Sequence, residues 1–119
     1  MEITNMILMD IGKGYNLEIT REMVEKSIHT FENKPVVYNN NQELSDYTIE
    51  AIVKKKYEEK CVGIIKYATI QDDEVIGEVA WFDSSYIKPK YDNWCIKLSE
   101  DRSEFILDGV EIFDRKEEE

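Results

Sequence analysis

Residues 61–82, CVGIIKYATIQDDEVIGEVAWF, contain the pattern that decides the fold class of this chain. Apolar and polar residues alternate with period two through CVGIIKYATI (61–70) and again through VIGEVAWF (75–82), and Asp72 and Asp73 separate the two runs. Such alternation on both sides of turn residues is typical of two antiparallel strands joined as a hairpin. We therefore expect a hairpin whose apolar side chains face a core shared with a helix.

The helix expected beside this hairpin covers residues 21–32. Thr20 can cap its N-terminus, and Ile19 and Val24 have the spacing of a hydrophobic staple. Pro35 prevents the helix from continuing. The core predicted for the helix and the hairpin consists of Val24, Ile28, Phe31, Val62, Ile64, Val79 and Trp81.

The rest of the chain is expected to add short strands and a second helix. The predicted strands cover residues 4–11, 15–19, 35–38 and 93–98, the second helix covers about 47–58, and a further hairpin over 104–113 turns at Asp108-Gly109. The predicted fold class is α+β, a small, mostly antiparallel β-barrel or curled sheet of six to seven strands with two inserted helices. We expect a single domain over residues 1–114 and a frayed acidic tail over 115–119.

Composition excludes several classes of protein. No apolar run reaches the length of a membrane span, and the N-terminus lacks the basic region of a signal peptide, so we expect a cytoplasmic protein. Cys61 and Cys95 are 34 residues apart and the chain has one histidine, which excludes a zinc site of ordinary type. Both cysteines are expected to be buried free thiols. No cofactor motif is present, and none is expected.

The net charge of −11 is concentrated in the C-terminal half of the chain. Residues 71–83 carry five acids and no base, and residues 100–119 carry nine acids and three bases. Direct binding of nucleic acid is disfavoured, because phosphate contacts need a basic face. The acidity either keeps the protein soluble or forms a surface that meets a basic partner or imitates nucleic acid. Asp72-Asp73-Glu74 has the spacing of a turn, and no metal site is expected there.

Two side chains are candidates for nucleophilic catalysis. His29 is the only histidine and lies in the predicted helix beside Ile28, and Ser99 follows the predicted strand 93–98. His29 has no serine or cysteine neighbour at a fixed spacing, and a role in a loop or turn explains Ser99 as well as nucleophilic chemistry does. From the residues alone, no catalytic constellation is complete.

Three segments resemble a known family. They are Lys34-Pro35-Val36-Val37, Val62-Gly63-Ile64-Ile65 and Gly77-Glu78-Val79-Ala80-Trp81-Phe82-Asp83. Over roughly residues 15–83 the chain resembles the maturation proteases of tailed-phage proheads, which have the small β-barrel fold of herpesvirus assemblin and are serine proteases. The resemblance implies a catalytic histidine at the end of the strand after Pro35 and a nucleophilic serine in a later Ser-x-Gly setting.

The chain departs from that family at both catalytic positions. The strand after Pro35 ends in Asn39, Asn40 and Asn41, and no asparagine acts as a general base near neutral pH. Ser99 lacks the following glycine and is followed by Glu100 and Asp101, which disfavour an oxyanion beside them. If the resemblance holds, the asparagines mark a lost active site.

Three hypotheses follow. The first is a phage- or prophage-encoded, catalytically inactive protease-like domain that acts by protein–protein contact in head assembly, in the host cytoplasm or in the virion. The second is an acidic inhibitor that imitates nucleic acid and binds a host or defence protein, and the third is an active serine protease that uses Ser99. Contact through the acids would involve Asp72, Asp73, Glu100 and Asp101, and apolar contact would involve Tyr86 and Tyr91. The partner is another protein, and self-association into a homo-oligomer stays open.

Overall fold

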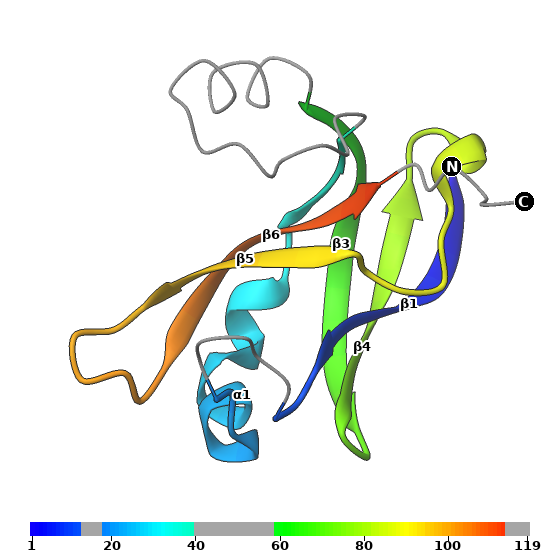
Figure 1. The fold of residues 1–119 in the computed structure, drawn as a ribbon. Helices are drawn as coiled ribbons and strands as arrows, with labels where there is room; N and C mark the ends of the chain where they lie inside the picture. The colour runs from blue at the N-terminus through cyan, green and yellow to red at the C-terminus, as the bar shows by residue number, and fades with distance from the viewer. Residues whose placement is uncertain (13–17, 40–58, 114–119) are drawn as a thin grey trace, which may run out of the picture.

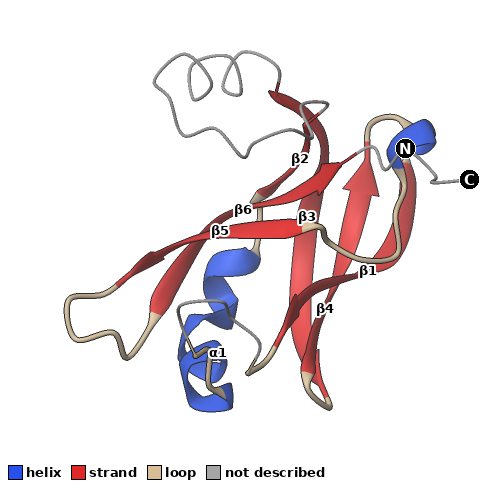
Figure 2. Ribbon diagram, in the orientation of Figure 1, coloured by secondary structure: helices blue, strands red, loops and turns tan. Residues whose placement is uncertain are grey.

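The computed structural model describes residues 1–12, 18–39 and 59–113 of the 119-residue chain (Figure 1). These residues form six strands, one α-helix and two short 3₁₀ helices (Figure 2). The elements in chain order are β1 (Glu2–Asp10), α1 (Arg21–Ser27), η1 (Ile28–Phe31), β2 (Pro35–Asn39), β3 (Glu59–Gln71), β4 (Glu74–Trp81), η2 (Ser84–Tyr86), β5 (Asn93–Leu98) and β6 (Phe105–Phe113). The predicted α+β class is confirmed. The predicted second helix (47–58), most of the predicted strand 15–19 and the predicted tail lie outside the described residues.

The strands form one mixed sheet in the order β1-β4-β3-β2-β6-β5. Neighbouring strands are antiparallel, except that β2 and β6 are parallel. The predicted closure into a barrel is wrong, because β1 and β5 are the two edges of the sheet and do not pair with each other. Residues 89–91, just before β5, contact the edge of β1: the Ile7 N–H donates to Pro89 O at 2.9 Å, and the Tyr91 N–H donates to Ile7 O at 2.9 Å.

The hairpin predicted over residues 61–82 is confirmed as β3 and β4. Its turn lies at Asp72-Asp73, where Asp72 has a positive φ of 54°. The predicted position of Ile64 in the core is wrong. In the register between β2 and β3, Val36 pairs with Gly63 and Val37 with Cys61, so Val62 is an extra residue. Such a bulge shifts the alternation of side chains by one position. Val62 and Ile65 are therefore buried, while Ile64 is half-buried on the opposite face.

The predicted first helix begins where expected. The Met23 N–H donates to the Thr20 side-chain oxygen at 3.2 Å, and Ile19 and Val24 are both fully buried. The α-helix ends at Ser27 and continues as η1 to Phe31. Two hydroxyls of this segment hold β6: Ser27 Oγ accepts the Phe105 N–H at 2.8 Å and Thr30 Oγ1 accepts the Leu107 N–H at 3.1 Å.

The hairpin predicted within residues 104–113 is wrong. Residues 105–113 form the single strand β6, which pairs with β5 across a turn at residues 99–104. Gly109 pairs with Cys95 and Leu107 with Ile96, so Asp108 is an extra residue in the middle of the strand. A Cβ on Gly109 would lie 3.1 Å from Pro35 O, so this glycine permits the close approach of β2.

One hydrophobic core lies between α1, η1 and one face of the sheet. Its largest fully buried side chains include Trp81, Phe31 and Phe105, and the last two rings meet edge to face at 6.0 Å. Within the described residues, no helix has the length and apolar composition needed to cross a bilayer. The predicted burial of Cys61 and Cys95 is wrong: both are exposed, and Cys95 Sγ lies 3.3 Å from Glu111 Oε1.

Candidate functional site

A groove of about 490 Å³ between the helical segment and the β5–β6 turn brings His29 and Ser99 to one surface. These two residues are 70 positions apart in the sequence, and only the pairing of β5 with β6 and the packing of η1 on β6 bring them together. Leu98, Phe105 and Ile106 give the groove an apolar part, and Lys26 and Lys97 add positive charge to its rim. The groove therefore holds both candidates for nucleophilic catalysis.

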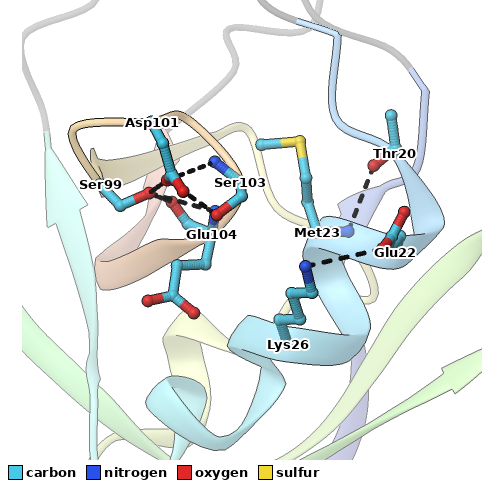
Figure 3. A network of polar contacts seen from close by, with 8 residues as sticks. All are labelled: Thr20, Glu22, Met23, Lys26, Ser99, Asp101, Ser103 and Glu104. Carbon is cyan, nitrogen blue, oxygen red and sulfur yellow. Dashed lines mark hydrogen bonds and ion pairs between the residues drawn. The ribbon is translucent and has the colours of Figure 1, made fainter.

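The Ser99 hydroxyl belongs to the hydrogen bonds that close the β5–β6 turn (Figure 3). Ser99 Oγ donates to Asp101 Oδ1 at 2.8 Å, and the same oxygen accepts the Glu104 N–H at 3.3 Å. Asp101 Oδ1 also accepts from the Ser103 hydroxyl at 2.7 Å and from the Ser103 N–H at 3.1 Å. These bonds, first of all the one from the Ser103 hydroxyl, lower the pKa of Asp101 to about 2.

These hydrogen bonds stabilise the turn. None of them joins the Ser99 hydroxyl to a base strong enough to take its proton. A nucleophilic hydroxyl needs a base that accepts its proton, and a carboxylate with a pKa of about 2 is too weak a base near neutral pH. In the part of the chain that the structure describes, no hydrogen bond joins His29 to Ser99, although both line the groove.

Asn39, the one described residue of the asparagine cluster, lies at the other end of β6 from the Ser99 turn. Asn39 is the last residue of β2 and pairs with Phe113, the last residue of β6, whereas the Ser99 turn leads into Phe105, the first residue of β6. The length of β6 separates the two places, a distance of roughly 25 Å for a strand of this size. Asn40 and Asn41 lie outside the described residues. The structure therefore does not bring Asn39 together with Ser99.

The predicted acidic contact residues lie in two separate turns on either side of α1 (Figure 1). Asp72 and Asp73 form the β3–β4 turn, where Asp72 O accepts a hydrogen bond from Arg21 at 2.8 Å, and Glu100 and Asp101 belong to the β5–β6 turn. Between these turns, α1 carries two ion pairs, Arg21 with Glu25 at 3.4 Å and Lys26 with Glu22 at 3.6 Å. Cations therefore interrupt the acidic surface. Within the described part of the chain, no group of histidine, cysteine and acidic side chains could hold a metal ion.

The two tyrosines predicted for apolar contact are half-buried and already have partners. The Tyr86 ring lies 4.7 Å from the Tyr38 ring, and Lys60 lies over its face at 5.2 Å. The Tyr91 hydroxyl donates to Asp10 at 2.8 Å, and partial burial together with this bond raises the pKa of Tyr91. Both rings pack against the core. They contribute to the fold more than to an open surface.

The sequence alone did not predict a second apolar surface, which lies on the other face of strands β1, β4 and β3. On the inner face, Met9 pairs with Val75 and Ile65 with Val79, and all four are fully buried. The alternate residues point to the opposite side, which we call the outer face. Its apolar members are Ile3, Ile7, Ile64, Tyr67, Ile76, Ala80 and Phe82.

None of these seven side chains belongs to the core cluster or packs against it. Ile3, Tyr67 and Phe82 have exposures of 55%, 47% and 52%, and Ile7, Ile64 and Ile76 are half-buried beside them. Together they form an apolar patch in which Ala80 is 4% exposed and which Asn5 and Glu78 interrupt. The sequence contains a signal for this face. Ile76 and Ala80 of β4 and the following residue Phe82 are apolar, whereas a strand with one solvent-exposed face would have polar residues at these alternate positions.

Glu78 is the charged residue in the middle of this patch. It pairs with Asn5 of β1 on one side and with Tyr67 of β3 on the other, and Ile76 and Ala80 flank it along β4. Tyr67 pairs with Glu78, and hydrogen bonding to this carboxylate together with its negative charge raises the pKa of the Tyr67 phenol. The centre of the outer face is therefore an anion set among apolar side chains.

Comparisons of the chain with family models, with curated proteins and with solved structures found no match.

Proposed function

We propose that this chain is a binding domain without catalytic activity, which acts through protein–protein contact made by the outer face of β1, β4 and β3. The observation that carries the proposal is the apolar surface of the outer face, which lies on the side of the sheet opposite the core. Clusters of exposed apolar side chains are typical of protein contact sites. The resemblance to prohead maturation proteases suggests that the partner is a component of phage head assembly.

The geometry around Ser99 supports the absence of catalysis. Its hydroxyl donates to Asp101 in a closed turn, and among the described residues no hydrogen bond joins it to a base that could accept its proton. A serine-directed phosphonate probe should therefore label neither Ser99 nor Ser84. Stoichiometric labelling of one serine, abolished by its change to alanine, would show an active hydrolase instead.

The contact itself can be tested with variants that leave the core intact. Tyr67→Ser and Phe82→Ser each remove an exposed aromatic ring from the outer face, and Ile106→Ser removes an apolar side chain of similar exposure (48%) on β6 as a matched control. In quantitative affinity capture from cells that carry the parent phage, one protein should be lost with both outer-face variants and retained with the control. Equal capture by all variants would place the contact elsewhere.

The salt dependence of that binding separates the proposal from imitation of nucleic acid. The Debye length falls from about 8 Å at physiological ionic strength to about 3 Å at 1 M, so binding through the acidic turns weakens steeply with salt. Contact through an apolar centre weakens little. A hundredfold loss of affinity between 0.1 and 0.5 M salt, with competition by nucleic acid, would favour the acids of the two turns and reject the outer face.

A further inference from the structure

We infer that the outer face binds a partner polypeptide that places an arginine or lysine against Glu78. This inference rests on the proposed function and names the chemistry that its partner must have.

The position of Glu78 makes it part of any contact that covers the patch. β4 is the middle strand of the three, and Glu78 lies between Ile76 and Ala80 along it. On the neighbouring strands, Ile3 and Ile7 lie on either side of Asn5, and Ile64 and Thr69 on either side of Tyr67. A partner that covers the isoleucines and the Phe82 ring therefore also covers the carboxylate.

Covering a carboxylate removes its water, and this loss must be compensated. A buried charge without a partner costs several kcal/mol, whereas a cation in hydrogen-bonding contact offsets most of that cost. Tyr67 pairs with Glu78 and is the phenol beside its carboxylate, and a carboxylate can accept about four hydrogen bonds. An arginine or lysine of the partner would supply the charge and the remaining donors, and it would discriminate against partners without a cation at that position.

Charge also argues against a second copy of this chain as the occupant. A face-to-face pair related by a two-fold axis would bring the two Glu78 carboxylates toward each other and join two chains of net charge −11. Among the described residues, the exposed bases beside the patch include Lys66, the neighbour of Tyr67, and Lys90, which pairs with Ile7 and forms an ion pair with Asp10 at 2.9 Å. A partner of opposite charge avoids both penalties, so we assign the face to a different, basic polypeptide.

The test uses two synthetic amphipathic helical peptides with the same leucine-rich face. They differ at one central residue, which is arginine in one and citrulline, its neutral isostere, in the other. Binding to the full-length chain is followed by amide chemical shifts. The arginine peptide should shift the amides of Ile76, Glu78 and Ala80 and should bind more tightly than the citrulline peptide.

Two variants complete a double-mutant cycle. Glu78→Gln keeps the shape of the side chain and removes its charge, and Glu100→Gln removes a charge from the β5–β6 turn as the matched control. Glu78→Gln should weaken the arginine peptide about tenfold and leave the citrulline peptide unchanged. Glu100→Gln should change neither affinity.

Other outcomes would overturn the inference in distinguishable ways. If both peptides bind the outer face equally and Glu78→Gln has no effect, the proposed function stands and the demand for a cation fails. If neither peptide shifts the outer face, the inference fails. A dimer in sedimentation equilibrium that Phe82→Ser abolishes would assign the face to a second copy. Nuclear Overhauser contacts from residues 47–58 to Tyr67 or Phe82 in the free protein would assign it to the chain itself.

Discussion

The two faces of strands β1, β4 and β3 both carry large apolar side chains but have opposite surroundings. Trp81 and Phe82 are adjacent in the sequence, yet Trp81 is 1% exposed on the inner face and Phe82 is 52% exposed on the outer face. The inner face is covered by α1, η1 and the strands that curl toward them, whereas the outer side chains belong to no core cluster. The comparison shows that apolar composition alone does not identify a core. A strand with apolar side chains on both sides can pack one face into the core and leave the other face outside it.

The sharpest test of this difference replaces the two adjacent aromatic residues. Trp81→Ala empties a core site and should lower the free energy of unfolding by about 3–5 kcal/mol. Phe82→Ala removes an exposed ring and should change it by less than about 0.5 kcal/mol. Denaturant melts of both variants measure these values. Similar losses for the two would show that the outer face is covered in the free protein.

The neighbours Gly77 and Ile76 provide a second comparison. A methyl group is added on the inner face at Gly77, and carbon atoms are removed from the outer face at Ile76. A Cβ on Gly77 would lie 2.3 Å from Leu8 Cδ1, and Leu8 is fully buried, so it has no free space to move into. Gly77→Ala should therefore destabilise the protein by about 1–3 kcal/mol. Ile76→Ala, which truncates a half-buried side chain on the outer face, should cost about 1 kcal/mol or less. Thermal unfolding of the two variants checks the order, and the reverse order would contradict it.

Two threonines on opposite faces test hydrogen bonding in the same way. The Trp81 indole N–H donates to Thr4 Oγ1 at 2.8 Å. Thr4→Val removes the acceptor and should cost about 1 kcal/mol, since it leaves a donor of a core residue without a partner. Thr69→Val, at an exposed position on β3, should stay within about 0.5 kcal/mol of the parent protein. Equal effects in denaturant melts would show that the indole bond contributes nothing.

The smallest expected effect concerns the pH dependence of the outer face. The hydrogen bond to Glu78 raises the pKa of Tyr67, so the neutral phenol is favoured in the folded state. The resulting stability is complete below the ordinary pKa of tyrosine and is lost as the pH rises through the higher folded value. Glu78→Gln should move the Tyr67 ring titration, followed by NMR, back toward the ordinary value, whereas Glu100→Gln should not move it. An unchanged titration in Glu78→Gln would show that the two side chains do not interact.

The parts of the fold that depend on neighbouring residues were predictable from the sequence. Thr20, Ile19 and Val24 identify the start of α1, because a cap and a staple involve residues within one turn of each other. The hairpin of β3 and β4 follows from period-two alternation around Asp72-Asp73.

The predictions that were wrong depend on contacts between residues that are far apart in the sequence. Asp108-Gly109 is typical of a tight turn, but Gly109 is required by the approach of Pro35 from β2, more than 70 positions earlier. Regular alternation along β3 predicts that Ile64 faces the core. The bulge at Val62 breaks this alternation, and it arises only from the pairing of β3 with β2. The candidate residues His29 and Ser99 were identified from the sequence as separate side chains, and their common groove was not, because it forms only where η1 packs on β6.

The sequence by itself determined which segments are extended, where the first helix begins and that the chain carries no local catalytic motif, because these properties depend on residues close together along the chain. Only the tertiary structure decided that the sheet stays open, that the Ser99 hydroxyl is engaged in a turn and that, within the described residues, the apolar side chains of one sheet face lie outside the core. The physical reason is that the side of the sheet on which a residue lies depends on bulges and strand pairing. These are set by the balance of contacts over the whole molecule and not by the alternation within any one strand.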